Sequence, residues 1–403
     1  MFSSRICFSL RGSQSNFVAS TLAGAQLLLA CSNASVATEQ ETSPLIYGLD
    51  TRRDLYEVDS ERSRSLMANT AMAMFDEPSL VRHSDGAVEY DETPLDELMG
   101  ICADERFKEQ ATAATCSGIL VTDSLVLTAG HCVRSTALCA RQTWAFGYSM
   151  TAPGIVPSLH TSDLYRCKSV PLCAHRTDPD GRRWDYAFVE LDRPVAPPRL
   201  PAVMSLDALP LGSRLEVIGF PGGLPVKSDS DAKLLDPRAG IGDYFALSSD
   251  TYDRSSGSGV FDREGLLRGL FLRGGNDYKY RSDLDCFASE RVEEPVDPAQ
   301  AEQAGYLGPA LAALCASGFD DERLCSLASH FSAPSLPSDA CEPSPSHAAS
   351  DQDTTMSGCA LSPRSSHSNL PNGPCGFLLA LVLLRLSRVR TQFSPTRGRS
   401  TRQ

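Results

Sequence analysis

The segment CSGILVTDSLVLTAGHC, residues 116–132, decides the fold. Two short apolar runs at 119–121 and 125–127 flank a polar Thr-Asp-Ser turn, and this pattern predicts a β-hairpin. Because a hairpin returns the chain to its start, we expect Cys116 and Cys132 to come within disulfide range. His131 would then be fixed at a strand end beside that disulfide, where a general base could work reproducibly.

A second informative segment is WDYAFVEL, residues 184–191, in which an acidic residue begins an apolar strand. A carboxylate at this place could accept the Nδ1–H of a histidine, hold its tautomer and stabilise the imidazolium that forms when the ring takes a proton. Asp185 is therefore the candidate partner of His131. An isolated aspartate at a strand start could equally be a surface cap.

The third segment is DTYDRSSGSGVF, residues 250–261, where a Ser- and Gly-rich turn leads into a strand. Small residues let the backbone coil tightly enough to point N–H groups at a developing oxyanion. Ser256 is the candidate nucleophile in this turn. Taken alone, such a turn is usually a flexible loop.

Together, the three segments resemble the trypsin-like serine peptidases, which carry His, Asp and Ser in this order. The nearest branch is the bacterial glutamyl endopeptidases, which LIYGLDTR at 45–52, VIGFPGGLP at 217–225 and SGSGVF at 256–261 also resemble. The resemblance spans about residues 45–328. It implies an all-β fold of two packed six-stranded antiparallel β-barrels of the chymotrypsin type, with a site between them. The implied catalytic residues are His131, Asp185 and Ser256.

Four positions depart from the family pattern or bear on specificity. Arg254 stands where the family has Gly, and the backbone N–H groups of Arg254 and Ser256 should form the oxyanion hole; a non-Gly residue resists the backbone angles needed there. Ser255 replaces the Asp that binds a new N-terminus in trypsin, so activation of that kind is not expected. Phe271 replaces a substrate-reading histidine, which argues against simple Glu specificity. Asp250 could pair with a basic substrate side chain or be a surface aspartate.

Further short apolar runs support a fold built from many strands. They lie at residues 186–191, 215–220, 259–261 and 266–272. One later stretch, 304–317, has apolar residues at helical spacing and predicts a C-terminal helix.

The N-terminal residues 1–31 predict a signal peptide, since Arg5 and Arg11 precede an apolar run at 17–30. The run ends in Leu-Leu-Ala before Cys31, which resembles the lipobox of bacterial lipoproteins and would make Cys31 a lipidated membrane anchor. Ordinary cleavage without lipidation is the alternative. Residues 32–44 are expected to be a short linker.

The C-terminal part predicts a disordered Ser/Pro-rich linker at 329–374, because it has too little apolar area to offset its ordering entropy. Residues 375–403 follow with a short apolar run and an arginine cluster. With Cys359, this pattern resembles the C-terminal sorting tails of myxobacterial surface proteins. The resemblance implies membrane association and display at the surface of a Gram-negative cell; a simple basic tail is the alternative.

Composition narrows the function classes. The net charge of −13 disfavours nucleic-acid binding. Fourteen cysteines without paired C-x-x-C groups favour disulfides in an oxidising compartment, and hence export, over a structural zinc site. Pairing is left open for a further set: Cys102, Cys139, Cys167, Cys173, Cys286, Cys315, Cys325 and Cys341.

These observations predict an exported serine endopeptidase that hydrolyses polypeptides through an acyl-enzyme and needs no metal or organic cofactor. A competing hypothesis is an inactive homologue that binds peptides or surface partners, which Arg254 favours. A purely structural surface protein would explain the two ends of the chain, but it would leave three ordered catalytic segments to coincidence.

Overall fold

The computed structural model describes residues 46–133, 136–275, 278–292 and 297–335, all within the first of two compact units, residues 1–349. The predicted signal peptide, N-terminal linker and sorting tail, and nearly all of the C-terminal linker, lie outside the described residues. Among the residues described, no helix is both long enough and apolar enough to span a membrane.

The first half of the described chain forms a closed β-barrel in the order β10-β11-β7-β6-β3-β8. All six neighbouring pairs of strands in this barrel are antiparallel. The predicted hairpin at residues 116–132 supplies two neighbouring strands of the barrel, and every residue of both is buried. The six strands are β3 (Ala71–Asp76), β6 (Cys116–Leu120), β7 (Leu125–Thr128), β8 (Gln142–Ala145), β10 (Leu164–Thr177) and β11 (Arg183–Leu191).

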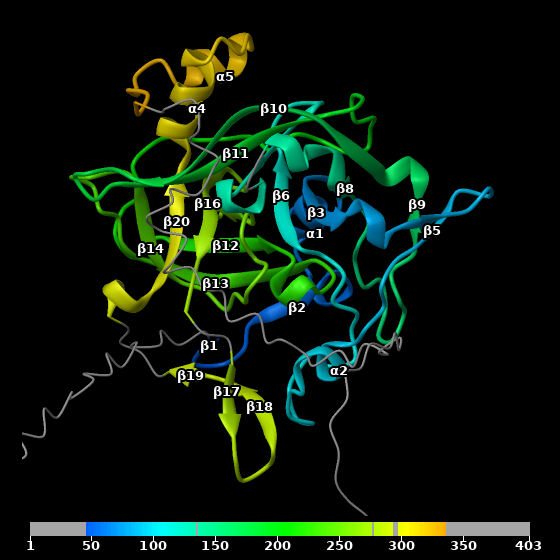
Figure 1. The fold of residues 1–403 in the computed structure, drawn as a ribbon. Helices are drawn as coiled ribbons and strands as arrows, with labels where there is room; N and C mark the ends of the chain where they lie inside the picture. The colour runs from blue at the N-terminus through cyan, green and yellow to red at the C-terminus, as the bar shows by residue number, and fades with distance from the viewer. Residues whose placement is uncertain (1–45, 134–135, 276–277, 293–296, 336–403) are drawn as a thin grey trace, which may run out of the picture. The chain divides into compact units, whose positions relative to one another are not determined.

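The second half closes another barrel, in the order β12-β15-β16-β20-β14-β13, with β13 pairing back to β12. A short N-terminal strand, β2 (Arg52–Asp54), pairs antiparallel with residues 227–229 at the start of β13. The predicted pair of six-stranded antiparallel barrels is thus confirmed within the described residues (Figure 1). Its strands are β12 (Arg214–Gly219), β13 (Lys227–Asp236), β14 (Tyr244–Ser248), β15 (Gly259–Phe261), β16 (Leu267–Arg273) and β20 (Glu302–Tyr306).

The predicted helix at 304–317 begins later than expected. Its first three residues belong to β20, which pairs with β14 and β16 and closes the second barrel. The helix α4 runs over Leu307–Ala316. This start places Pro309 in the first helical turn, where its missing N–H costs nothing; a start at residue 304 would have put the proline inside the helix.

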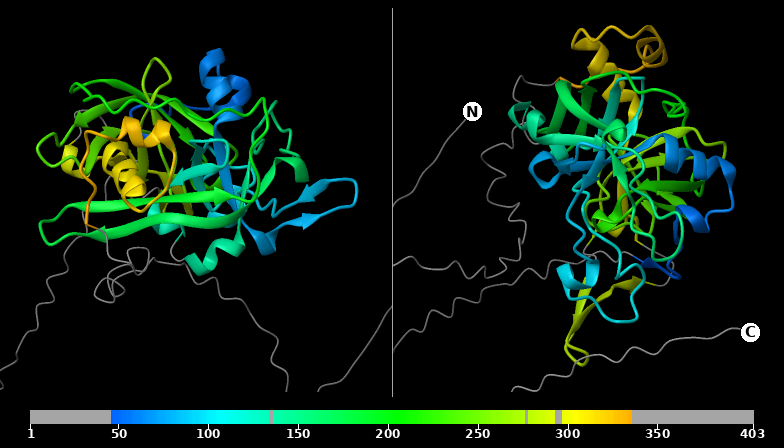
Figure 2. Two further views of the ribbon diagram at one scale, coloured as in Figure 1. Left: turned by 90° about the horizontal axis from the view of Figure 1, so that it is seen from above. Right: turned by 90° about the vertical axis from the view of Figure 1, so that its right-hand side faces the viewer.

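The helices α4 and α5 (Glu322–Leu327), yellow to orange in both views of Figure 2, lie together at one side of the barrels. The Cys315–Cys325 disulfide links them, and the Asp321 side chain caps α5 by accepting the Leu324 N–H at 2.9 Å. Leu311 and Leu314 of α4 are fully buried and pack into the main hydrophobic core. The helical pair therefore covers apolar barrel surface that would otherwise face water.

Smaller elements surround the barrels. Two disulfides link these elements. Cys102–Cys286 joins the segment after α2 to a peripheral hairpin, and Cys139–Cys167 joins the 3-10 helix Thr136–Arg141, just before β8, to β10. The peripheral strands are β1 (Ile46–Tyr47), β4 (Val81–Arg82), β5 (Ala87–Glu89), β9 (Leu159–His160), β17 (Tyr278–Arg281), β18 (Cys286–Ser289) and β19 (Arg291–Val292); the other α-helices are α1 (Glu61–Asn69), α2 (Leu95–Met99) and α3 (Gly130–Val133).

Candidate active site

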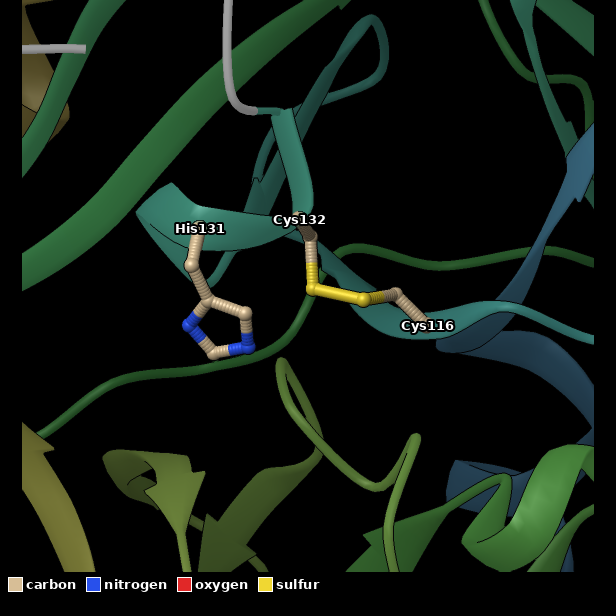
Figure 3. Close-up of side chains that lie close together, drawn as sticks. All are labelled: Cys116, His131 and Cys132. Carbon is tan, nitrogen blue, oxygen red and sulfur yellow. A yellow bond between two sulfur atoms is a disulfide. The ribbon is translucent and has the colours of Figure 1, made fainter. Parts of the chain in front are cut away.

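His131 lies in α3, the single turn that follows the buried strand β7. The next residue, Cys132, forms a disulfide with Cys116 at the start of β6, as Figure 3 shows beside the imidazole. The preceding Gly130 packs tightly, because a Cβ placed there would lie 2.1 Å from the Ala174 carbonyl oxygen. The histidine is thus held on both sides by rigid parts of the first barrel, while its side chain remains 31% exposed.

Asp185, in β11, makes two contacts with this histidine. Its Oδ2 lies 2.9 Å from the His131 Nδ1, and its Oδ1 accepts the His131 backbone N–H at 3.0 Å. Burial by itself would raise the pKa of this carboxyl, since the side chain is only 4% exposed. The charge and hydrogen bonds of His131 outweigh burial and lower the pKa of Asp185 to about 2. The carboxylate is therefore ionised at neutral pH, and it holds His131 at two points, the ring nitrogen Nδ1 and the backbone N–H.

Ser256 belongs to the loop before β15 and is held against the first barrel. Its carbonyl oxygen accepts the Ser117 N–H of β6 at 2.8 Å, and the Sγ of Cys132 lies 3.7 Å from the same oxygen. Its hydroxyl donates to the Leu272 carbonyl oxygen at 3.1 Å. The structure therefore places the Ser256 backbone against the residue that follows His131.

Arg254 has the left-handed backbone conformation, with a φ of 65°. A non-glycine residue pays about 1–2 kcal/mol for this conformation. The Arg254 side chain is anchored, because its Nη1 donates to the Thr112 carbonyl oxygen at 3.2 Å. Arg254 thus adopts the left-handed backbone angles that a non-glycine residue is expected to resist.

The turn around Ser256 leaves two backbone donors available. Ser255 donates its N–H to Tyr252, Gly257 to Phe271 and Ser258 to Ser255. Within the described part of the chain, no hydrogen bond uses the N–H of Arg254 or Ser256. These are the two groups that the sequence predicts for an oxyanion hole.

The two predicted substrate-binding residues are both buried. Phe271 is 2% exposed and packs in the core of the second barrel, with Phe245 and Val260 among its neighbours. The Asp250 carboxylate accepts the backbone N–H groups of Tyr47 at 2.9 Å and Thr51 at 2.7 Å. Phe271 is therefore a core residue here, and Asp250 anchors the N-terminal segment instead of facing solvent.

The raised pKa of Asp250 predicts that the stability of the folded protein depends on pH. Burial and the neighbouring Asp229 carboxylate raise its pKa to about 7. In the unfolded chain the carboxyl loses its proton near pH 4, so between about pH 4 and 7 the folded state binds more protons. The free energy of unfolding should fall across that range, by at most about 1.4 kcal/mol per pH unit for one group.

Urea unfolding at pH 5, 6 and 7 tests this in the wild type and Asp250→Asn. Because the amide cannot titrate, the variant should gain stability relative to the wild type as pH rises. Parallel pH profiles for the two proteins would contradict the raised pKa.

Sequence reasoning missed two features of the site. His175 pairs directly with Asp185 across the β10–β11 hairpin. The Asp-Pro-Asp-Gly turn at 178–181 carried a signal for this register, because a turn centred near 180 places residues 175 and 185 opposite each other. The contact of the Ser256 hydroxyl with the Leu272 carbonyl had no local signal, since it depends on the closure of the second barrel.

A family model agrees with this architecture. Residues 116–270 match the family model of the Trypsin-like peptidase domain. The match spans His131, Asp185 and Ser256, and it supports the chymotrypsin-fold serine peptidase family. A solved structure titled "Structure of Glu endopeptidase in complex with MPD" is similar at 14% identity and a TM-score of 0.35, covering 61% of this chain and 92% of that one. No curated protein matches the chain.

Proposed function

We propose that this chain is an exported serine endopeptidase with His131, Asp185 and Ser256 as its triad. The observation that carries the proposal is the two-point contact between the Asp185 carboxylate and His131, beside the anchored Ser256 loop. An imidazole oriented by a buried carboxylate next to a serine is the arrangement that acyl transfer requires. The family match adds that the substrates are polypeptides.

The proposed mechanism uses only groups of this chain. The Nε2 of His131 takes the Ser256 hydroxyl proton as the oxygen attacks a peptide carbonyl, and Asp185 stabilises the imidazolium. The N–H groups of Arg254 and Ser256 bind the oxyanion, the leaving amine takes the proton from His131, and water then hydrolyses the acyl-enzyme. Each N–H donor of this kind is worth about 10²–10³ in turnover.

Export is supported by the disulfides among the described residues. Cys102–Cys286, Cys116–Cys132, Cys139–Cys167 and Cys315–Cys325 are the kind of bonds that persist in an oxidising compartment. Anchoring through Cys31 or the C-terminal tail is part of the same proposal and rests on the sequence patterns.

Fluorophosphonate labelling tests the nucleophile. We expect the wild type to be labelled covalently and Ser256→Ala to take up no probe, because the phosphonate bonds to the activated serine oxygen. The neighbouring Ser255→Ala is a matched control: among the described residues its hydroxyl accepts the Tyr252 N–H at 3.1 Å and makes no other hydrogen bond, so labelling should persist. Uptake that survives in Ser256→Ala would exclude this nucleophile.

The alternative is a peptide-binding homologue without catalysis, which Arg254 in place of glycine favours. The left-handed backbone of Arg254 weakens this alternative, because the substitution has not displaced the turn from the conformation that glycine would allow. A folded wild type that takes up no probe would favour the binding protein over the enzyme.

A further inference from the structure

His175 is an ionisable side chain at the His131–Asp185 pair that the proposed hydrolysis does not use. It lies in β10 directly opposite Asp185 in β11, so the two side chains project from the same face of the barrel. The ring centroids of His131 and His175 are 5.7 Å apart. A second imidazole is therefore built into the wall beside the catalytic pair.

These three side chains form a group of donor atoms suited to a metal ion. One nitrogen from each histidine and one oxygen of Asp185 lie within 4.8 Å of one another. Zinc binds imidazole nitrogen and carboxylate oxygen at about 2.0–2.2 Å in tetrahedral sites, so small side-chain movements would bring all three atoms onto one ion. Two histidines and a carboxylate would leave the fourth position to water.

A second cluster at the site does not suit a metal. Cys116 and Cys132 also lie within 4.8 Å of a His131 nitrogen, but their sulfur atoms are bonded to each other. A disulfide sulfur offers no thiolate to a metal ion. The histidine pair with Asp185 is therefore the better candidate among the described residues.

Exposure to solvent favours an ion at this site, whereas a nearby cation opposes it. The Asp185 side chain is 4% exposed, while the His131 side chain that contacts it is 31% exposed, so this pair borders on solvent. Arg273 is a mostly buried cation whose charge also acts on Asp185, so it opposes the binding of a second cation there. This competition predicts a reversible site, weaker than a four-ligand structural zinc site.

We propose that His131, His175 and Asp185 form a zinc-binding site and that zinc bound there inhibits the peptidase. The His131 nitrogen that contacts Asp185 is Nδ1, so the ion takes the place of the proton between them. In a neutral ring with zinc on Nδ1, the proton moves to Nε2, and Nε2 has no lone pair left to accept the serine proton. Zinc binding itself is independent of the proposed function; the inhibitory consequence rests on it.

Zinc titration by calorimetry tests the site without relying on activity. The Ser256→Ala substitution prevents self-cleavage, so the full chain that carries it is the parent protein for these measurements. We expect the parent to bind zinc, and we expect its zinc affinity to fall about 10–100-fold or more when His175→Gln or His175→Ala is added. Adding His160→Gln instead should leave the affinity unchanged, because this exposed histidine lies on β9 and its Nδ1 contacts Ser162. Calcium should not compete, since it prefers oxygen ligands.

The inhibitory step is tested by fluorophosphonate labelling of the chain with Ser256 intact, over a series of zinc concentrations. Zinc should slow labelling, a chelator should restore it, and His175→Gln should raise the half-inhibitory zinc concentration by at least about tenfold. Zinc affinity that is equal in folded His175 variants and their parent, or absent in the parent, would overturn the proposal. If the parent binds zinc through His175 but is never labelled, the site stands and the proposed peptidase function fails.

Discussion

Asp185→Asn should lower the rate of fluorophosphonate labelling and of casein cleavage about 10⁴-fold, the size of effect known for this change in a triad. The carboxylate now accepts both the backbone N–H and the Nδ1–H of His131. An amide has one acceptor oxygen, so its NH₂ must face one of these two positions. If it faces Nδ1, the ring is held in the tautomer with its proton on Nε2, which cannot accept a proton from Ser256.

A structural effect must be separated from this catalytic one. Asp262→Asn is a matched control, because Asp262 is also buried and accepts the backbone N–H groups of Glu264 and Leu266. It follows β15 on the side away from the Ser256 loop, and its loss should reduce stability without a large change in labelling rate. A decrease of less than about tenfold in a folded Asp185→Asn protein would contradict the proposed role.

The fold could be predicted because its deciding segment is local. The hairpin at residues 116–132 carries its own turn, two apolar strands and a cysteine at each end, so neighbouring residues alone predict the observed β6–β7 pair and the disulfide. The start of α4 was harder to place. The stretch 304–317 has apolar residues at helical spacing, but the backbone groups of its first three residues pair with β14 and β16, and barrel closure overrides the local pattern.

The substrate-facing part of the site could not be predicted in this way. Asp250 has the right offset from Ser256, but its carboxylate is used by the backbone of an N-terminal segment about 200 residues away in sequence. Phe271 lies in a strand whose alternation points it into the barrel core. Both outcomes depend on long-range packing, which the spacing of one sequence does not report.

Gly257→Ala should lower both the stability of the protein and its rate of labelling. Gly257 has a φ of +88°, and a Cβ added there would lie 2.0 Å from the Ser117 carbonyl oxygen and 2.5 Å from the Thr128 Oγ1. These atoms belong to the first barrel, so the collision would push the Ser256 loop away from β6. A displacement of about 1 Å can cost roughly 10² in rate, and we expect labelling to fall at least that far.

Stability should fall in the same variant by two separable contributions. Left-handed strain in alanine costs about 1–2 kcal/mol, and the steric collision adds about 1–3 kcal/mol. Gly212→Ala isolates the strain, because Gly212 has a φ of +77° with no atom within 4 Å of the added Cβ. The losses in free energy of unfolding measured with urea for the two variants should therefore differ only by the cost of the collision. Equal losses of stability, together with unchanged labelling of Gly257→Ala, would show that the contact between the Ser256 loop and the first barrel does not position the nucleophile.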